Sequence, residues 1–220
     1  MNRPRQFDLI AFDWDGTLFD STTLIVRCIQ SACSDVGAPV PSDRDASYVI
    51  GMGLADALQH VAPGLAPDRY HELGNHYRRH YFARQHEVVL FEGTVAMLQA
   101  LKARNHWLVV ATGKSRRGLD EALESVELRG VFHGSRTADE TASKPNPQML
   151  NELMREFDVD PARTLMIGDT THDLEMARNA GTASIGVSYG AHEPAAFDAY
   201  PTLHIAHSVA DLHTWLVAHG

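Results

Sequence analysis

The chain has 220 residues, of which 44% are hydrophobic and 21% charged, and its formal net charge is −9 at pH 7. This composition is typical of a globular protein, and the length allows one large domain or a core with a smaller insertion. The negative charge argues against nucleic acid or an anionic membrane surface as the main partner, because both require clustered Lys and Arg. The sequence shows neither a signal peptide nor an apolar run long enough to span a membrane, so we expect a cytoplasmic protein.

The first predicted element is a short buried strand over residues 7–13, apolar on both faces as in a parallel sheet. Residues 22–88 are helical in character, with prolines between the pieces and no convincing strand. Helices are predicted there over residues 22–36, 55–61 and 67–86.

From residue 94 onwards, predicted helices and strands alternate. Such alternation predicts a parallel sheet with right-handed crossovers and helices on both faces. The fold class is therefore α/β, with an all-helical insertion after the first strand. The expected helices cover residues 94–104, 115–126, 147–157, 171–179 and 209–218, and the expected strands cover residues 107–112, 131–135, 164–168, 183–187 and 203–205.

Cysteine and histidine spacing gives no sign of a metal knuckle. The two cysteines, Cys28 and Cys33, fall on different faces of a helix-like segment, and we expect buried or bystander thiols, without a disulfide, in a reducing cytoplasm. The histidines along the long polar helix show no zinc spacing and are interpreted as surface residues. They are His71, His76, His80 and His86.

Acidic residues gather in the loops that follow two of the predicted strands, where open parallel sheets bind ligands. Asp13 and Asp15 stand at i and i+2, which on an extended chain directs both side chains the same way. We expect Asp169 and Asp173 to converge on the same spot from a neighbouring strand. Two carboxylates about 4 Å apart repel by roughly 4 kcal/mol at an effective dielectric near 20, so the group requires a cation or protonation. Mg²⁺, which prefers oxygen ligands, suits this set.

Groups that suit a phosphate lie in the other loops of the same edge. The Thr112 hydroxyl, the backbone N–H of Gly113 and the Lys144 ammonium supply hydrogen-bond donors and positive charge. Together with the acidic residues they predict metal-assisted chemistry on a phosphoryl group.

The stretches "DWDGT", "ATGKS", "SKPNP" and "GDTTHD", in this order, resemble the four motifs of the haloacid dehalogenase superfamily in its phosphatase branch. The resemblance covers essentially the whole chain. It implies a Rossmann-like, doubly wound parallel sheet core over residues 1–20 and 89–220, with a helical cap domain over residues 21–88.

The resemblance also implies catalytic roles. Asp13 would be the nucleophile that forms an aspartyl-phosphate, and Asp15 would act as general acid and then as general base. Thr112 and Lys144, with Gly113, would bind the phosphoryl group. Because dehalogenases of this superfamily lack an acid at the position of Asp15, halide displacement is not expected.

The metal site implied by the resemblance uses Mg²⁺ as cofactor. Its ligands would be Asp13, Asp169 and the backbone carbonyl of Asp15, with Asp173 in support. His172, beside Asp173, is interpreted as a solvated residue at a helix start.

Substrate choice would come from the cap. Gly51 and Met52 lie in a stretch, residues 49–54, that looks like the specificity loop of phosphoglycolate phosphatases; a plain turn between helices is the other interpretation. Arg78 or Arg79 could bind a substrate carboxylate. The alternative, that both arginines lie on a solvated helix face, is at least as well supported by the sequence.

Two other motif matches do not hold. "GKS" at residues 113–115 resembles the end of a P-loop, but that motif requires a glycine at position 108, where this chain has Leu108. "GVSYG" around Ser188 resembles a nucleophile elbow but lacks the following helix, and residues 188–192 are expected to form a loop at the rim of the site.

The sequence therefore predicts a Mg²⁺-dependent phosphatase that acts on a small phosphorylated metabolite, with a phosphoglycolate phosphatase-like enzyme as the leading interpretation. The open alternatives are a pyrophosphatase, a nucleotide or sugar phosphatase, a phosphomutase or phosphotransferase, and a sensor without turnover. The sequence does not reveal the oligomeric state.

Overall fold

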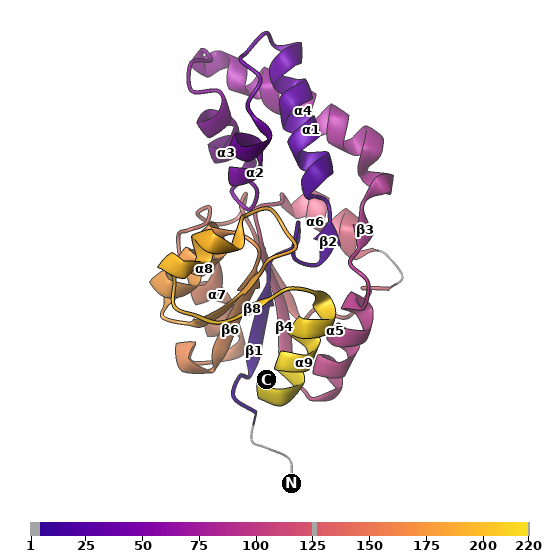
Figure 1. Cartoon of the computed structure of the whole chain (residues 1–220), viewed down its shortest axis with the longest axis vertical. Helices are drawn as coiled ribbons and strands as arrows, with labels where there is room; N and C mark the ends of the chain where they lie inside the picture. The colour runs from indigo at the N-terminus through magenta and orange to yellow at the C-terminus, as the bar shows by residue number, and fades with distance from the viewer. Residues whose placement is uncertain (1–4, 125–126, 220) are drawn as a thin grey trace.

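The computed structural model describes residues 5–124 and 127–219, and within them six parallel strands form the central sheet (Figure 1). The strand order is β5-β4-β1-β6-β7-β8, which puts β1 in the middle with crossovers running to both sides. The α/β prediction is thereby confirmed. The strands are β1 (Leu9–Phe12), β4 (Trp107–Thr112), β5 (Gly134–Thr137), β6 (Thr164–Gly168), β7 (Ala183–Val187) and β8 (Thr202–Ala206).

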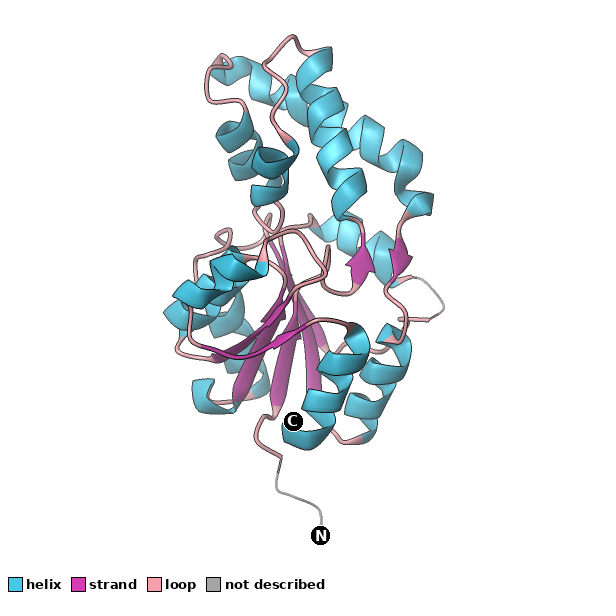
Figure 2. Cartoon of the chain, viewed as in Figure 1, coloured by secondary structure: helices cyan, strands magenta, loops and turns pink. Residues whose placement is uncertain are grey.

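Helices cover both faces of this sheet, as the secondary-structure colours of Figure 2 show. In β1, Ile10 and Phe12 belong to the core cluster under α5 and α9, whereas Leu9 and Ala11 belong to the cluster under α7 and α8. Both faces of the strand are buried, which explains its continuous apolar run. The helices of this body are α5 (Thr94–Ala103), α6 (Arg116–Leu123), α7 (Gln148–Phe157), α8 (Thr171–Ala180) and α9 (Val209–His219), with short 3₁₀ turns at Pro161–Arg163 and Pro194–Ala199.

Three predicted strands, 107–112, 164–168 and 183–187, agree with the structure residue for residue. The strand predicted at 131–135 is displaced to Gly134–Thr137. Val131 and Phe132, which suggested it, pack into the core from the turn before the strand, so their hydrophobicity marks burial without strand geometry. The last two residues of the helix predicted at 115–126 lie outside the described residues.

Four further helices form a separate body, the cap, above the carboxyl ends of the strands (Figure 1). α1 and α4 lie side by side, and the helices share a core that includes Ile29, Cys33, Leu58 and Leu73. Cys28 and Cys33 are both buried and unpaired, as expected. The cap helices are α1 (Thr22–Asp35), α2 (Asp43–Tyr48), α3 (Leu54–Val61) and α4 (Tyr70–Arg84), with 3₁₀ turns at Pro67–Arg69 and Gln85–Glu87.

A small antiparallel pair joins the two bodies: β2 (Phe19–Asp20) pairs with β3 (Val89–Leu90). Two-residue strands carry no readable period, so the sequence did not indicate them. The domain boundaries at 20/21 and 88/89, which fall at this pair, stay a prediction.

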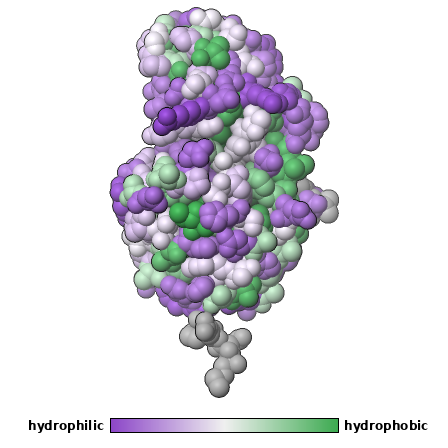
Figure 3. Space-filling view, viewed as in Figure 1, coloured by the Kyte–Doolittle hydropathy of each residue, from purple (hydrophilic) through white to green (hydrophobic). Residues whose placement is uncertain are grey.

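The surface is mixed in character. On the face shown in Figure 3, hydrophilic residues dominate the lower edge of the cap and hydrophobic ones lie in smaller patches. In residues 5–124 and 127–219, no helix combines the length and apolar character needed to cross a membrane.

Candidate active site

A buried ion cluster lies at the carboxyl end of the central strands. Lys144 Nζ lies 2.7 Å from Asp13 Oδ1 and 2.6 Å from Asp173 Oδ1, and these side chains are at most 1% exposed. Carboxylate oxygens of Asp13, Asp169 and Asp173 lie within 4.8 Å of one another. The structure therefore brings together four residues that the sequence predicted for one site, from three separate loops.

The cluster carries more negative than positive charge. Burial raises the pKa of Asp13 well above its usual range, and it raises the pKa of Asp169 to about 7, helped by the charge of Asp173. For Lys144, burial lowers the pKa, but the charges of Asp13 and Asp173 outweigh it and the pKa is raised. Asp13 Oδ2 is buried without a hydrogen-bond partner in the part of the chain that the structure describes. Three converging carboxylates supply the hard oxygen donors that a divalent cation such as Mg²⁺ prefers.

Asp169 is oriented by residues of the loop after β1 and of the loop after β7. Thr17 Oγ1 donates a hydrogen bond to Asp169 Oδ1 at 2.8 Å, and the backbone N–H of Ala191 donates to Oδ2 at 2.7 Å. Gly16 has φ +82°, and a Cβ there would lie 2.1 Å from Asp169 Oδ2. The glycine of "DGT" is thus required both by its backbone conformation and by the carboxylate packed against it.

Asp173 is held at the start of α8 by a capping box. The Asp173 N–H donates to Thr170 Oγ1 at 3.4 Å, and the Thr170 N–H donates to Asp173 Oδ2 at 3.1 Å. One carboxylate oxygen therefore caps the helix and the other binds Lys144. The supporting role of Asp173 toward a metal ion stays a prediction.

Asp15 has a different set of partners from Asp13, although both residues line one cavity. Ser21 Oγ donates to Asp15 Oδ1 at 2.8 Å, and Lys114 Nζ lies 3.0 Å from Oδ2. The extended-chain argument for parallel side chains holds only as far as Phe12, where β1 ends. The Asp15 carboxylate is not in the Asp13 cluster, and its backbone carbonyl as a metal ligand stays a prediction.

Lys114 is a candidate that the sequence reasoning missed. Its ammonium links Asp15 to the cap, since it also donates to the Tyr81 hydroxyl at 3.0 Å and lies 4.9 Å from the centre of that ring. The available signal was the lysine of "TGKS", directly after the predicted phosphate-binding Thr112 and Gly113.

The predicted phosphate-binding loop meets the predicted specificity loop. Thr112 is buried at the end of β4, and its Oγ1 accepts a hydrogen bond from the Lys114 N–H at 3.2 Å. A Cβ on Gly113 would lie 2.4 Å from the carbonyl oxygen of Met52 and 2.7 Å from that of Gly51. The backbone of the cap loop therefore rests directly on Gly113.

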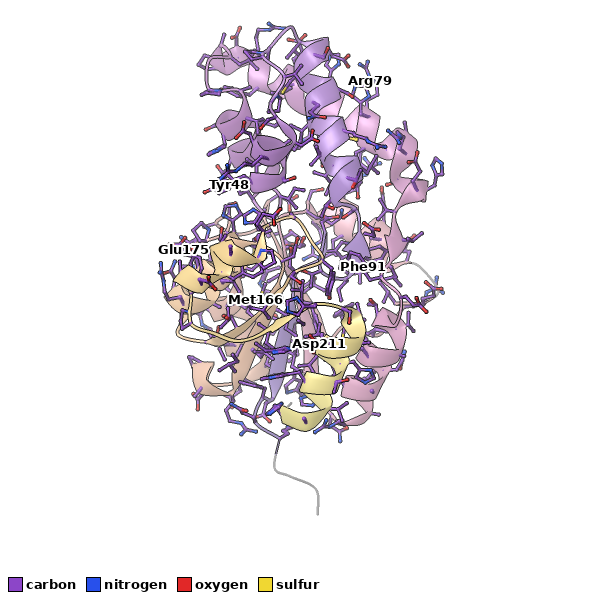
Figure 4. The ribbon with its side chains drawn as sticks, in the orientation of Figure 1. Tyr48, Arg79, Phe91, Met166, Glu175 and Asp211 are labelled. Atoms are coloured by element: carbon purple, nitrogen blue, oxygen red, sulfur yellow. The ribbon has the colours of Figure 1, made fainter. Side chains whose placement is uncertain are left out.

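Two core histidines hold the cap at another point. His172 Nε2 lies 2.7 Å and His192 Nε2 3.0 Å from the backbone carbonyl oxygen of Tyr48, at the junction visible in Figure 4. The Tyr48 ring stacks on His192. The expectation that His172 is solvated is wrong, because the cap covers it and leaves it 6% exposed. A third link is the Gly53 N–H, which donates to Ser143 Oγ at 2.7 Å.

Between cap and core lies a cavity of about 390 Å³, lined by Asp13, Asp15, Thr112, Gly113 and the cap loop 49–54. Of the two arginines considered for a substrate carboxylate, Arg78 lines this cavity. Arg79 points away to Asp35 and is 65% exposed.

The loop over residues 188–192 begins outside the cavity lining, where Ser188 Oγ lies within hydrogen-bond distance of His207 Nδ1, at 2.8 Å. His192, at the far end of that loop, is buried under Tyr48.

The fold and site define an α/β protein with a helical cap over an acidic, lysine-containing site. The family model of the haloacid dehalogenase-like hydrolases matches residues 10–187, and the chain belongs to that family. It is 36% identical to "Probable phosphatase IndB" of Dickeya dadantii (strain 3937), over 84% of this chain and 82% of that protein. It is 30% identical to a phosphoglycolate phosphatase of Vibrio vulnificus (strain YJ016), over 94% of this chain and 95% of that protein. The crystal structure of a "predicted phosphoglycolate phosphatase" from Haemophilus somnus 129pt superposes with a TM-score of 0.82 at 25% identity, covering 96% of this chain and 98% of that one.

Proposed function

We propose that this enzyme is a phosphatase that hydrolyses a small phosphate monoester through a phosphorylated Asp13, with phosphoglycolate as the leading substrate. The observation that carries the proposal is the state of the Asp13 carboxylate. Lys144 holds Oδ1, whereas Oδ2 has no hydrogen-bond partner among the described residues, and Asp13 lines the cavity. An oriented, unblocked carboxylate oxygen is what a nucleophile needs.

In the first step, an Asp13 oxygen attacks phosphorus and the bond from phosphorus to the ester oxygen breaks. Asp15 gives its proton to the leaving oxygen. In the second step, Asp15 takes a proton from water, the water oxygen attacks phosphorus, and the bond to Asp13 breaks. Lys144, the Thr112 hydroxyl and the Gly113 N–H stabilise charge on the phosphoryl oxygens.

The cation proposed for this site is Mg²⁺, held by Asp13 and Asp169 with Asp173 in support. When bound, it supplies positive charge against the carboxylates and the phosphate. The cytoplasmic location predicted from the sequence stays part of the proposal.

The cavity wall favours a second candidate, a phosphate ester with a larger organic group such as a nucleotide. Phosphoglycolate offers the wall one methylene and one carboxylate, for which Arg78, on α4, is the candidate partner among the lining residues. Much of the lining is apolar and aromatic, which suits a ring or a longer carbon chain. These residues are Ile25, Ile29, Val49, Ile50, Leu54, Tyr77, Tyr81 and Phe82.

The test is phosphate release from phosphoglycolate, pyrophosphate, nucleoside monophosphates and hexose phosphates, with Mg²⁺ and with EDTA. A preference for phosphoglycolate of tenfold or more in kcat/KM, about 1.4 kcal/mol in transition-state binding, supports the leading substrate. A similar preference for a nucleotide replaces it with the second candidate. Phosphate transfer to a sugar, seen by product analysis, or no Mg²⁺-dependent release contradicts the proposed hydrolysis.

A further inference from the structure

A second cluster of ligand-type side chains lies on the cap, where the end of α1 meets α4. Asp35 is the last residue of α1, and His76 and His80 are one turn apart on α4. His76 Nδ1 lies 2.7 Å and His80 Nε2 2.8 Å from Asp35 Oδ2. The ligand atoms of the three residues lie within 4.8 Å of one another. The histidines lie at the surface, as predicted, but the sequence could not indicate that His76 and His80 share a partner on α1.

Asp35 Oδ2 has more potential hydrogen-bond donors around it than it can accept from. The Arg79 guanidinium brings a third nitrogen to Asp35 Oδ2, at 3.0 Å, and also lies 2.7 Å from His76 Nδ1. A carboxylate oxygen has two lone pairs, so three donors exceed what Oδ2 can accept. His76 Nδ1 faces a donor and an acceptor at once and can satisfy only one of them.

The position of Asp35 also calls for positive charge. A carboxylate at the C-terminal end of a helix lies at the negative end of the macrodipole, which a cation offsets; Arg79 supplies this charge, and a bound metal ion would replace it.

We propose that Asp35, His76 and His80 bind a divalent transition-metal ion of the Zn²⁺ type. Two imidazoles four residues apart on a helix, with one carboxylate, form a ligand set that Zn²⁺ favours and Mg²⁺ does not. An open hollow beside Asp35 and His80 leaves room for a water as fourth ligand. Arg79 is 65% exposed, so its long side chain can turn into solvent when the ion binds.

The ion would join the first and the last long helices of the cap. Arg79, which marks the cluster in Figure 4, lies on the cap away from the junction at Tyr48. The site is therefore separate from the Asp13 cluster, which offers only oxygen ligands, and the inference does not depend on the proposed function.

The experiment is a calorimetric titration of the full-length chain with Zn²⁺ in the presence of excess Mg²⁺, repeated with Co²⁺ followed by its visible absorption. We expect one Zn²⁺ site per chain that Mg²⁺ does not displace. Loss of a ligand in His76→Gln or His80→Gln should weaken Zn²⁺ binding at least about tenfold. His71→Gln, a change of the same type on the same helix outside the cluster, should leave it unchanged.

Arg79→Gln separates a metal site from a hydrogen-bond network. If the arginine competes with the ion, this variant binds Zn²⁺ more tightly, and tighter binding supports the proposal. Weaker binding would make Arg79 part of the site and count against it. Asp169→Asn should keep the Zn²⁺ site, and equal Zn²⁺ affinity in the wild type, His76→Gln and His80→Gln would overturn the proposal.

Discussion

Lys114 and Asp15 form a nearly buried ion pair between the loop after β4 and the loop after β1. Lys114 Nζ lies 3.0 Å from Asp15 Oδ2, and the side chains are 12% and 13% exposed. Burial lowers the pKa of Lys114, but the charge of Asp15 and the contacts of Tyr81 outweigh it, so the pKa is raised. The ammonium is therefore charged at neutral pH and couples the proposed acid–base residue to the cap.

Replacing Lys114 with Met should lower kcat by about tenfold to a hundredfold, part of the 10²–10⁴-fold that general acid–base catalysis contributes. The reason is that Asp15 loses the cation that orients it. Steady-state kinetics checks this, with Lys102→Met on α5 as the matched control. An unchanged kcat for Lys114→Met would show that the ion pair is structural.

Asp13→Asn should abolish phosphate release while the chain stays folded, because the amide has the same shape but cannot act as the nucleophile. The measurement combines phosphate release with far-UV circular dichroism. Asp20→Asn, which changes an exposed carboxylate of the neighbouring β2, should retain activity. Substantial turnover by folded Asp13→Asn would refute the aspartyl-phosphate mechanism.

Gly113→Ala should displace the cap loop, since the added Cβ would lie 2.4 Å from the Met52 carbonyl oxygen. We expect KM to rise about tenfold or more, because a 1 Å displacement of a substrate-positioning group can cost about 10²-fold. The control is Gly64→Ala, whose Cβ meets nothing within 4 Å. If both variants keep the wild-type KM, the contact between Gly113 and the cap loop does not position the substrate.

Cation binding should weaken as pH falls below neutrality. Burial raises the pKa of Asp169 to about 7 and that of Asp13 well above its usual range, so protons occupy these carboxylates in acid. A cation binds only the ionised carboxylates and must displace any proton bound there. For each proton displaced, the cation affinity falls by up to about tenfold per unit decrease in pH. Mg²⁺ titrations of phosphate release on either side of pH 7 test this, and a constant apparent affinity would contradict it.

His106 should make the fold sensitive to acid. Burial lowers the pKa of its imidazole from 6.5 to about 4, although its ring bonds the Phe7 carbonyl oxygen. Between these values the unfolded chain binds a proton that the folded chain does not. Stability should therefore fall as pH drops through this window, by up to about 1.4 kcal/mol per pH unit, and be unaffected by this group above it.

His106→Asn keeps a hydrogen-bond donor near Phe7 but cannot titrate. Urea unfolding at neutral pH and at about pH 5 should show a smaller loss of stability in this variant than in the wild type. Equal losses in the two proteins would assign the acid sensitivity to other groups.

Much of the fold and the candidate site follows from local patterns in the sequence. The apolar runs of β4, β6 and β7 end at polar turns, and both features lie within a few residues of one another. Because parallel strands present their carboxyl ends at one edge, this was enough to bring Asp13, Thr112, Lys144 and Asp169 to one place. Local patterns failed where elements are short, as in α2, β2 and β3.

Contacts between distant segments were decided by tertiary structure alone. The meeting of His172 and His192 with Tyr48, the pairing of Lys114 with Asp15, and the convergence of two histidines on Asp35 join segments at least 41 residues apart. Hydrophobic periodicity reports which side of an element is buried, but not which element covers it. That choice depends on how the cap packs on the core and α1 on α4, and it turns side chains that look solvated in the sequence into partners.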